Sequence, residues 1–335
     1  MHYPVIAASA PKRSTGRMKY QPILQQQPAC MKRRLLFAAA QTYHPEREPT
    51  ERRVGWIEPP LVLRREGAIG HRATDLALVG RVREGVVVAF RGSLPPFFNG
   101  GSDGWTVLLD WLNDALSVCI DTPDYGGGVH LGFAVSTGRL WEDVQERPGI
   151  RATIQRLLDR GAADGLSRPH LFLTGHSKGG ALANLAAYRA ARLPEWRDLP
   201  ISVATIAAAR AGNGDFARAY EAERIACLRY EMPADPVPHL PPGPATPGWV
   251  HALANKVAPG LAAADYHPVG VQVSATAGQP PWLTSWLKRA TKLFSPQGIG
   301  LAWSSPGALF AHAICPQSGY DRLICTGETA CGHGH

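Results

Sequence analysis

The sequence lacks a run of about 20 apolar residues, and none of its six cysteines form a Cys-x-x-Cys pair. These absences argue against a membrane-spanning helix and against the commonest metal and redox motifs. Basic motifs interleaved with aromatic side chains are also missing, so the net charge of +8 does not predict binding to nucleic acid. A chain of 335 residues, 45% hydrophobic, is long enough for one large α/β domain, and we expect a single domain.

Both ends of the chain differ in composition from its middle. Residues 1–30 mix proline, glutamine and basic residues without periodicity and are expected to form a disordered, basic leader. The apolar run within 31–40 is only six residues, which is short for a signal peptide, so this segment is interpreted as the first helix of the fold. A cytoplasmic location is therefore expected. Residues 326–335 are predicted to form a mobile tail.

The cysteines predict neither disulfides nor a metal site. Cys119 and Cys227 lie in apolar stretches and are predicted to be buried free thiols. The remaining cysteines near the end of the chain, with two terminal histidines, match no standard metal-ligand spacing. These are Cys315, Cys325, Cys331, His333 and His335.

Between the two ends, strand-like and helix-like segments alternate. Predicted strands cover residues 76–80, 86–90, 201–206 and 225–230, and predicted helices cover 150–158 and 180–192. This alternation is typical of an α/β fold with a central, mostly parallel sheet flanked by helices. The domain is expected to span residues 31–325, with a Pro-, Gly- and Trp-rich insertion at 243–307.

The sharpest motif is Gly175-His-Ser177-Lys-Gly179, which lies between an apolar strand-like run and a small-residue helix. A serine between two such glycines is typical of a nucleophile elbow, the tight strand-to-helix turn of α/β hydrolases. The helix that follows would direct its N-terminal N–H groups at the serine, where they stabilise negative charge. We therefore predict an α/β-hydrolase fold with Ser177 as the nucleophile.

A nucleophilic serine needs a histidine to take its proton and a carboxylate to orient that histidine. In this fold the acid and then the histidine follow the serine along the chain. Asp235 is the strongest acid candidate because it follows a predicted strand within a proline-rich loop. His267 and His312 both remain candidates for the base. This chemistry requires no cofactor and no metal, and none is predicted.

Several motifs in order along the chain resemble the class 3 lipase family of fungal-type triacylglycerol lipases. They are Val88-Ala-Phe-Arg-Gly-Ser93, Asp110-Trp-Leu-Asn-Asp114, Val129-His-Leu-Gly-Phe133, Thr174-Gly-His-Ser-Lys-Gly-Gly-Ala-Leu-Ala183, Ala209-Arg-Ala-Gly-Asn213 and Asp235-Pro-Val-Pro-His-Leu-Pro-Pro242. The resemblance covers roughly residues 35–325. Each motif alone is weakly specific, whereas their common order is highly specific.

The resemblance implies a role for individual residues. Ser177 would be the nucleophile, Asp235 the orienting acid and His312, in preference to His267, the base. The oxyanion hole would be formed by Ser93 and by the backbone N–H of Lys178. Two motif histidines, His130 and His176, are expected to be structural hydrogen-bonding groups, and residues 94–104 are expected to form a short flap over the acyl site.

The implied activity is hydrolysis of a lipid or other hydrophobic carboxylic ester through an acyl-enzyme. Phospholipase, thioesterase or acyltransferase activity would use the same residues, and an inactive scaffold that binds lipid or protein is a further alternative. In residues 281–294, tryptophans and leucines fall on one helical face and Lys288, Arg289 and Lys292 on the other. A surface helix packed on the core explains that pattern, and so does peripheral contact with a lipid interface. The sequence does not predict an oligomeric state.

Overall fold

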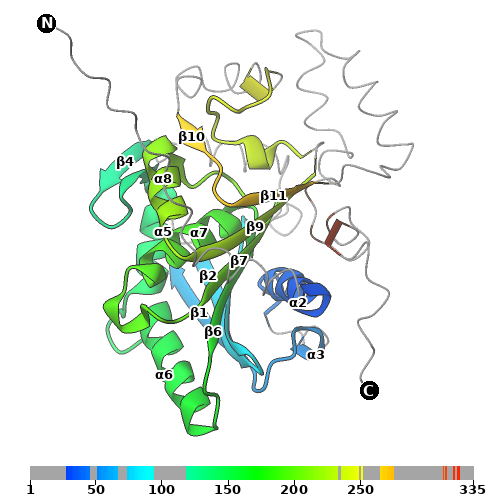
Figure 1. The fold of residues 1–335 in the computed structure, drawn as a ribbon, viewed down its shortest axis with the longest axis vertical. Coiled ribbons are helices and arrows are strands. Elements are labelled where there is room, and N and C mark those ends of the chain that lie inside the picture. Colours follow the sequence, from blue (N-terminus) through cyan, green and yellow to red (C-terminus); the bar gives the residue numbers. More distant parts are fainter. Residues whose placement is uncertain are drawn as a thin grey trace, which may run out of the picture.

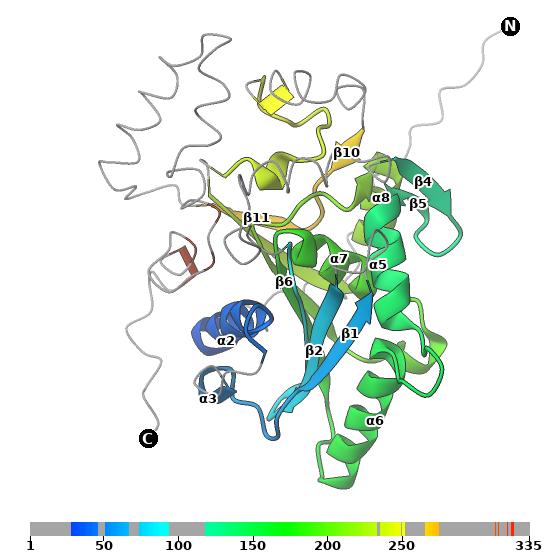
Figure 2. The ribbon, with the colours of Figure 1, turned by 180° about the vertical axis from the view of Figure 1, so that it is seen from behind.

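The computed structural model describes residues 28–45, 51–66, 74–93, 118–232, 235–248, 250–251 and 265–274. It also describes His312, Ile314, Tyr320, Leu323 and Ile324. In this part of the chain a central sheet lies between two groups of helices, as the ribbon shows from both sides (Figure 1, Figure 2). The predicted flap, residues 94–104, and the predicted amphipathic segment, residues 281–294, lie outside the described residues.

The central sheet has seven strands in the order β1-β2-β3-β6-β7-β9-β11. Its strands are β1 (Leu61–Glu66), β2 (Thr74–Val82), β3 (Gly85–Phe90), β6 (His170–His176), β7 (Ile201–Ile206), β9 (Ile225–Glu231) and β11 (Val271–Ser274). The pairs from β3 to β11 are parallel, and β1 and β2 join antiparallel at one edge. The predicted mostly parallel sheet is therefore confirmed.

Helices cover both faces of this sheet (Figure 1). One face carries α2 (Pro28–Gln41) and α3 (Glu51–Val54), and the other carries α5 (Leu131–Trp141), α6 (Ile150–Ala163) and α7 (Lys178–Ala191). Alternation along the strands supplies both layers of the core: on β2, Leu76 and Leu78 pack toward α2, while Ala77 and Val79 pack toward the opposite helices. This two-sided burial is typical of an α/β fold with helices on both faces of a mostly parallel sheet.

A second, smaller sheet has the order β10-β8-β5-β4 and is antiparallel throughout. Its strands are β4 (Cys119–Thr122), β5 (Gly127–His130), β8 (Gly212–Asn213) and β10 (Tyr266–His267). It lies beside α8 (Gly214–Ala222) (Figure 1). Two short 3-10 helices, η4 (Pro194–Trp196) and η5 (Val237–His239), also lie within the described ranges.

Two predicted boundaries and one predicted burial differ from the structure. Helix α2 begins at Pro28, so the last three residues of the predicted leader belong to the first helix. Residues 271–274 of the predicted insertion form β11, an edge strand of the central sheet. Cys227 is buried as predicted, but the prediction of burial was wrong for Cys119, which is exposed because β4 is an edge strand with one face toward solvent.

The helices in the described ranges are all too short or too polar to cross a membrane. Across the same ranges, no three His, Cys, Asp or Glu side chains gather as they would to hold a metal ion.

Candidate active site

Ser177 occupies the turn between β6, which ends at His176, and α7, which begins at Lys178. Its backbone has φ 58° and ψ −128°, a region that residues with a Cβ atom rarely adopt. Such strain is held in place by surrounding structure and clusters at functional sites. Here the Ser177 N–H donates to the carbonyl of Ile206 at 3.0 Å, and the Ser177 carbonyl accepts from Gly180 at 3.0 Å.

The glycines around Ser177 allow main chains to approach one another without a side chain between them. A Cβ atom on Gly175 would lie 2.2 Å from the carbonyl oxygen of Gly179. A Cβ on Gly179 would lie 2.2 Å from the carbonyl oxygen of Phe90, at the end of β3. Both glycines of the predicted elbow are therefore required by the close contact of β6, α7 and β3.

Asp235 lies just beyond the end of β9, which pairs in parallel with β7, the neighbour of β6. Its side chain is completely buried, and its carboxylate accepts several hydrogen bonds. Oδ1 accepts the backbone N–H of Val237 at 3.0 Å, and Oδ2 accepts the hydroxyl of Tyr320 at 2.7 Å. Burial and the nearby Asp235 raise the pKa of Tyr320 well above its usual value, so its hydroxyl remains a donor.

His312 completes this cluster. Its Nδ1 lies 2.9 Å from Oδ2 and 3.1 Å from Oδ1 of Asp235. Because a carboxylate only accepts, Nδ1 carries the proton in these two contacts. The structure therefore brings together the acid and one of the two histidines that the sequence left open.

His176 connects His312 to the elbow. Its Nε2 lies 2.7 Å from the backbone carbonyl of His312, and its Nδ1 lies 2.8 Å from the hydroxyl of Tyr43, just beyond α2. A carbonyl only accepts, so Nε2–H is the donor and Nδ1 accepts the Tyr43 hydroxyl. Burial lowers the pKa of His176 to about 3, which keeps it in this neutral form. His176 is thus a structural hydrogen-bonding group, as predicted.

His130 also has a structural role. It is the N-cap of α5, and its Nδ1 accepts the backbone N–H of Phe133 at 3.3 Å. Burial lowers the pKa of His130 to about 3, so this ring is also neutral. A neutral imidazole can accept this N–H, which satisfies one of the donors at the start of the helix.

The segment after β3 passes directly beside the elbow. A Cβ atom on Gly92 would lie 2.6 Å from the carbonyl oxygen of His176 and 3.1 Å from the Cβ of Ser177. Ser93 follows immediately, so the two predicted contributors to an oxyanion hole, Ser93 and Lys178, come from segments in contact. Lys178 is the first residue of α7, where backbone N–H groups point out of the helix.

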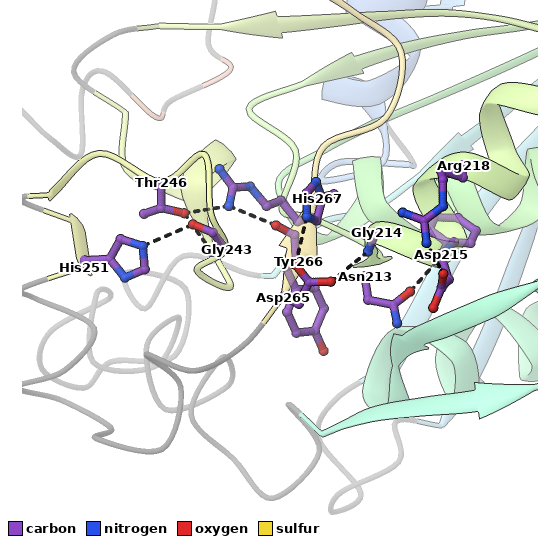
Figure 3. A network of polar contacts seen from close by, with 12 residues as sticks. Asn213, Gly214, Asp215, Arg218, Gly243, Thr246, His251, Asp265, Tyr266 and His267 are labelled. Carbon is purple, nitrogen blue, oxygen red and sulfur yellow. Dashed lines mark hydrogen bonds and ion pairs between the residues drawn. The ribbon is translucent and has the colours of Figure 1, made fainter. Parts of the chain in front are cut away.

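The other histidine that the sequence left open, His267, lies on β10 in the smaller sheet (Figure 3). Its Nε2 lies 2.9 Å from Oδ1 of Asp265, whose Oδ2 accepts the N–H of Gly214 at 3.4 Å. The His267–Asp265 pair is therefore separate from the His312–Asp235 pair. Asp215, near the start of α8, is exposed and contacts Arg218.

Sequence reasoning missed three contributors to this site. Tyr43 and Asp75 are 133 and 103 residues from their elbow partners, His176 and Lys178, and no local motif marks them. The sequence does contain a signal for the Lys178–Asp75 pair, because a lysine within an apolar elbow and an aspartate within an apolar strand each need a partner. The third contributor, Tyr320, is 85 residues from its partner Asp235.

The fold, the elbow serine and the His312–Asp235 pair are the features expected of an α/β hydrolase. Residues 87–244 match the family model described as Lipase (class 3). This segment, which carries Ser177 and Asp235, belongs to the class 3 lipase family. His312 lies beyond the match, so its place in the site is supported by its contacts with Asp235 and His176.

Comparisons with individual proteins agree with this assignment. The chain is 29% identical over 174 residues to a lipase of Caenorhabditis elegans, covering 52% of this chain and 42% of that protein. It is 30% identical over 216 residues to a phospholipase A1 of Oryza sativa subsp. indica, covering 62% of this chain and 46% of that protein. The matches therefore span less than half the length of these two relatives.

Among solved structures, lipase II from Rhizopus niveus is similar with a TM-score of 0.52 and 21% identity. The similarity covers 76% of this chain and 82% of that one. At this level of identity the likeness shows a shared fold.

Proposed function

We propose that this protein is a serine hydrolase that cleaves a hydrophobic carboxylic ester through an acyl-enzyme on Ser177. The observation that carries the proposal is the His312–Asp235 pair, at 2.9 and 3.1 Å, which also contacts His176, the residue before the strained elbow serine. The family of residues 87–244 and the lipid hydrolases named above support a lipid ester as the substrate.

In the proposed mechanism, His312 accepts the Ser177 hydroxyl proton at Nε2 while the serine oxygen attacks the ester carbonyl. Asp235 keeps the proton on Nδ1 and stabilises the imidazolium that forms. The N–H groups of Lys178 and Ser93 stabilise the tetrahedral oxyanion. His312 then donates its proton to the departing alkoxide, which leaves the acyl group on Ser177. Water, activated by the same histidine, releases the acid and restores the serine.

The first test compares Ser177→Ala and His312→Ala with a matched control, His267→Ala. Loss of a triad residue is expected to reduce turnover of a chromogenic acyl ester by roughly 10⁴-fold or more. The His267→Ala variant is expected to retain most of the wild-type turnover. Unfolding curves check that each variant folds. Turnover by Ser177→Ala equal to that of the wild type would refute the proposal. Loss of turnover in His267→Ala but not in His312→Ala would reassign the base to His267.

Labelling with a fluorophosphonate probe separates an enzyme from an inactive scaffold. An activated Ser177 is expected to react, and Ser177→Ala is not. The relative from rice favours a phospholipid as a second candidate substrate. Hydrolysis of emulsified triacylglycerol and of phosphatidylcholine vesicles, measured side by side, distinguishes the two. Comparable turnover of a thioester, or acyl transfer to an added alcohol, would favour the thioesterase or acyltransferase alternative.

Two expectations from the sequence stay proposals. These are a cytoplasmic location and peripheral contact of residues 281–294 with a lipid interface. Fractionation of cells that express the full chain tests the first. Co-sedimentation with anionic vesicles tests the second, and equal binding by Trp282→Ala/Trp286→Ala would contradict it.

A further inference from the structure

Lys178 and Asp75 form a buried ion pair immediately next to the nucleophile. The Lys178 Nζ lies 2.7 Å from Oδ1 of Asp75, and the two side chains are 12% and 3% exposed. Burial lowers the pKa of Lys178, and the opposing charge of Asp75 raises it. The two residues come from segments 103 positions apart, so the contact joins distant parts of the chain.

The pair links one segment of the proposed oxyanion hole, at the start of α7, to β2, the strand beside the other segment. Lys178 is the first residue of α7 and supplies one backbone N–H. Asp75 lies on β2, where the carbonyl of the next residue, Leu76, accepts the N–H of Arg91 at 2.9 Å. Asp75 is thus beside the point at which the Gly92–Ser93 segment leaves the sheet.

Stability alone does not explain this pair. Removing two charges from water is costly, and well-packed apolar residues often serve as well or better. The second carboxylate oxygen of Asp75, Oδ2, is buried and has no hydrogen-bond partner among the described residues. The cost of burying this carboxylate is therefore only partly offset. The pair has a geometric consequence instead, because it fixes the first turn of α7 against β2.

Resting on the proposed function, we propose that the side chains of Lys178 and Asp75 are positioning residues of the oxyanion hole. The ion pair sets the separation between the Lys178 N–H and the Gly92–Ser93 segment, and neither side chain contacts the substrate. Oxyanion stabilisation depends on donors held at hydrogen-bond distance from the developing charge. A displacement of about 1 Å at such a site reduces the rate by about 10²-fold.

A purely electrostatic role would behave differently. Lys178 and Arg91 both bring positive charge near Asp75. If only the local charge mattered, removing the lysine would slow the reaction and removing the carboxylate would leave it unchanged or accelerate it. The positioning role requires that both changes slow the reaction, because either one breaks the contact.

The experiment measures kcat and KM of Lys178→Met and Asp75→Asn on a soluble acyl ester, with active sites counted by the fluorophosphonate probe. Both variants are expected to lose roughly 10- to 100-fold in kcat, with KM within about threefold. Lys178→Arg, which keeps a cation in reach of the carboxylate, is expected to recover most of the loss. The matched control is Glu84→Gln, which breaks the half-buried Arg34–Glu84 pair on another part of the fold and is expected to leave kcat unchanged.

Asp75→Asn with unchanged or higher kcat would overturn the proposal, as would unchanged kcat in both single variants despite lower stability. If either single variant fails to fold because the other member of the pair is left as an unpaired buried charge, the double variant Asp75→Asn/Lys178→Met removes that charge. Low kcat in that folded double variant supports positioning, and wild-type kcat overturns it. A wild-type chain that neither turns over esters nor reacts with the probe would refute the proposed function instead.

Discussion

At the scale of single residues, the carboxylate of Asp235 depends on donors from three separate places. The His312 ring, the Tyr320 hydroxyl and the Val237 N–H all meet it in a completely buried position. A buried carboxylate is costly unless it is hydrogen-bonded. These donors therefore hold the charge that orients His312, and losing one affects both stability and the position of the ring.

Tyr320→Phe tests this dependence. The change removes the hydroxyl that donates to Asp235 and accepts the Met232 N–H at 3.1 Å, so both buried partners lose a bond. We expect a loss of about 1–3 kcal/mol in unfolding free energy and a several-fold fall in kcat. Denaturant titration and ester turnover measure the two effects. Tyr125→Phe, in the β4–β5 turn, is the control for activity, and kcat equal to wild type in Tyr320→Phe would contradict the prediction.

The sequence indicated Ser177 and Asp235 because each lies in a compact local motif at the end of a strand. It narrowed the base to two histidines and could go no further without a family resemblance. The choice between His267 and His312 depends on which aspartate each meets, and that is set by tertiary contacts. The roles of Asp75 and Tyr43 could not be predicted from the sequence for the same reason.

At the scale of elements, the elbow is defined by main-chain contacts among β6, α7 and β3. The glycines at 175 and 179 leave no room for a methyl group, since the nearest atoms are backbone carbonyls that cannot rotate away. The strained backbone of Ser177 is maintained by this packing. The shape of the turn is thus determined by its neighbours as much as by its own residues.

Gly175→Ala is expected to destabilise the protein by roughly 2–3 kcal/mol, as overpacked sites commonly do, and to abolish most activity. The control is Gly138→Ala in α5, where the added methyl would lie 3.9 Å from its nearest neighbour, Arg189. Replacing that helical glycine is expected to be neutral or to stabilise by up to about 1 kcal/mol. Thermal unfolding and ester turnover measure both, and an equally stable, active Gly175→Ala would contradict the prediction.

Elements with clear hydrophobic periodicity were predictable. The strand predicted at 201–206 coincides with β7, and the helix predicted from 150 begins where α6 begins. The smaller sheet was missed because its strands have only two to four residues, too few to show alternation. The pairing of β8 with β10 depends on contacts between segments more than 50 residues apart.

At the scale of the whole molecule, several histidines are buried in the neutral form. Burial lowers the pKa of His130 and His176 to about 3 and that of His170 to about 4. In the unfolded chain these rings take up protons below about pH 6.5. The unfolded state therefore binds more protons between about pH 6.5 and 4, and the free energy of unfolding must fall as the pH falls through that window.

Each such histidine contributes up to about 1.4 kcal/mol per pH unit to this fall. His170→Gln retains a polar group for its partner Ser202, 2.8 Å away, but does not titrate. It is expected to reduce the slope of unfolding free energy against pH between 6.5 and 5 by about that amount. Denaturant titrations across the window measure the slope. An unaltered slope in His170→Gln would contradict the prediction.

The order of the site along the chain has a consequence for synthesis. The described strands of the central sheet end at Ser274, whereas His312 follows Asp235 by 77 residues. A ribosome therefore synthesises Ser177 and Asp235 well before His312. In the proposed mechanism a growing chain carries an inert serine until His312 reaches Asp235 and His176. The onset of probe labelling would then report that translation has passed residue 312.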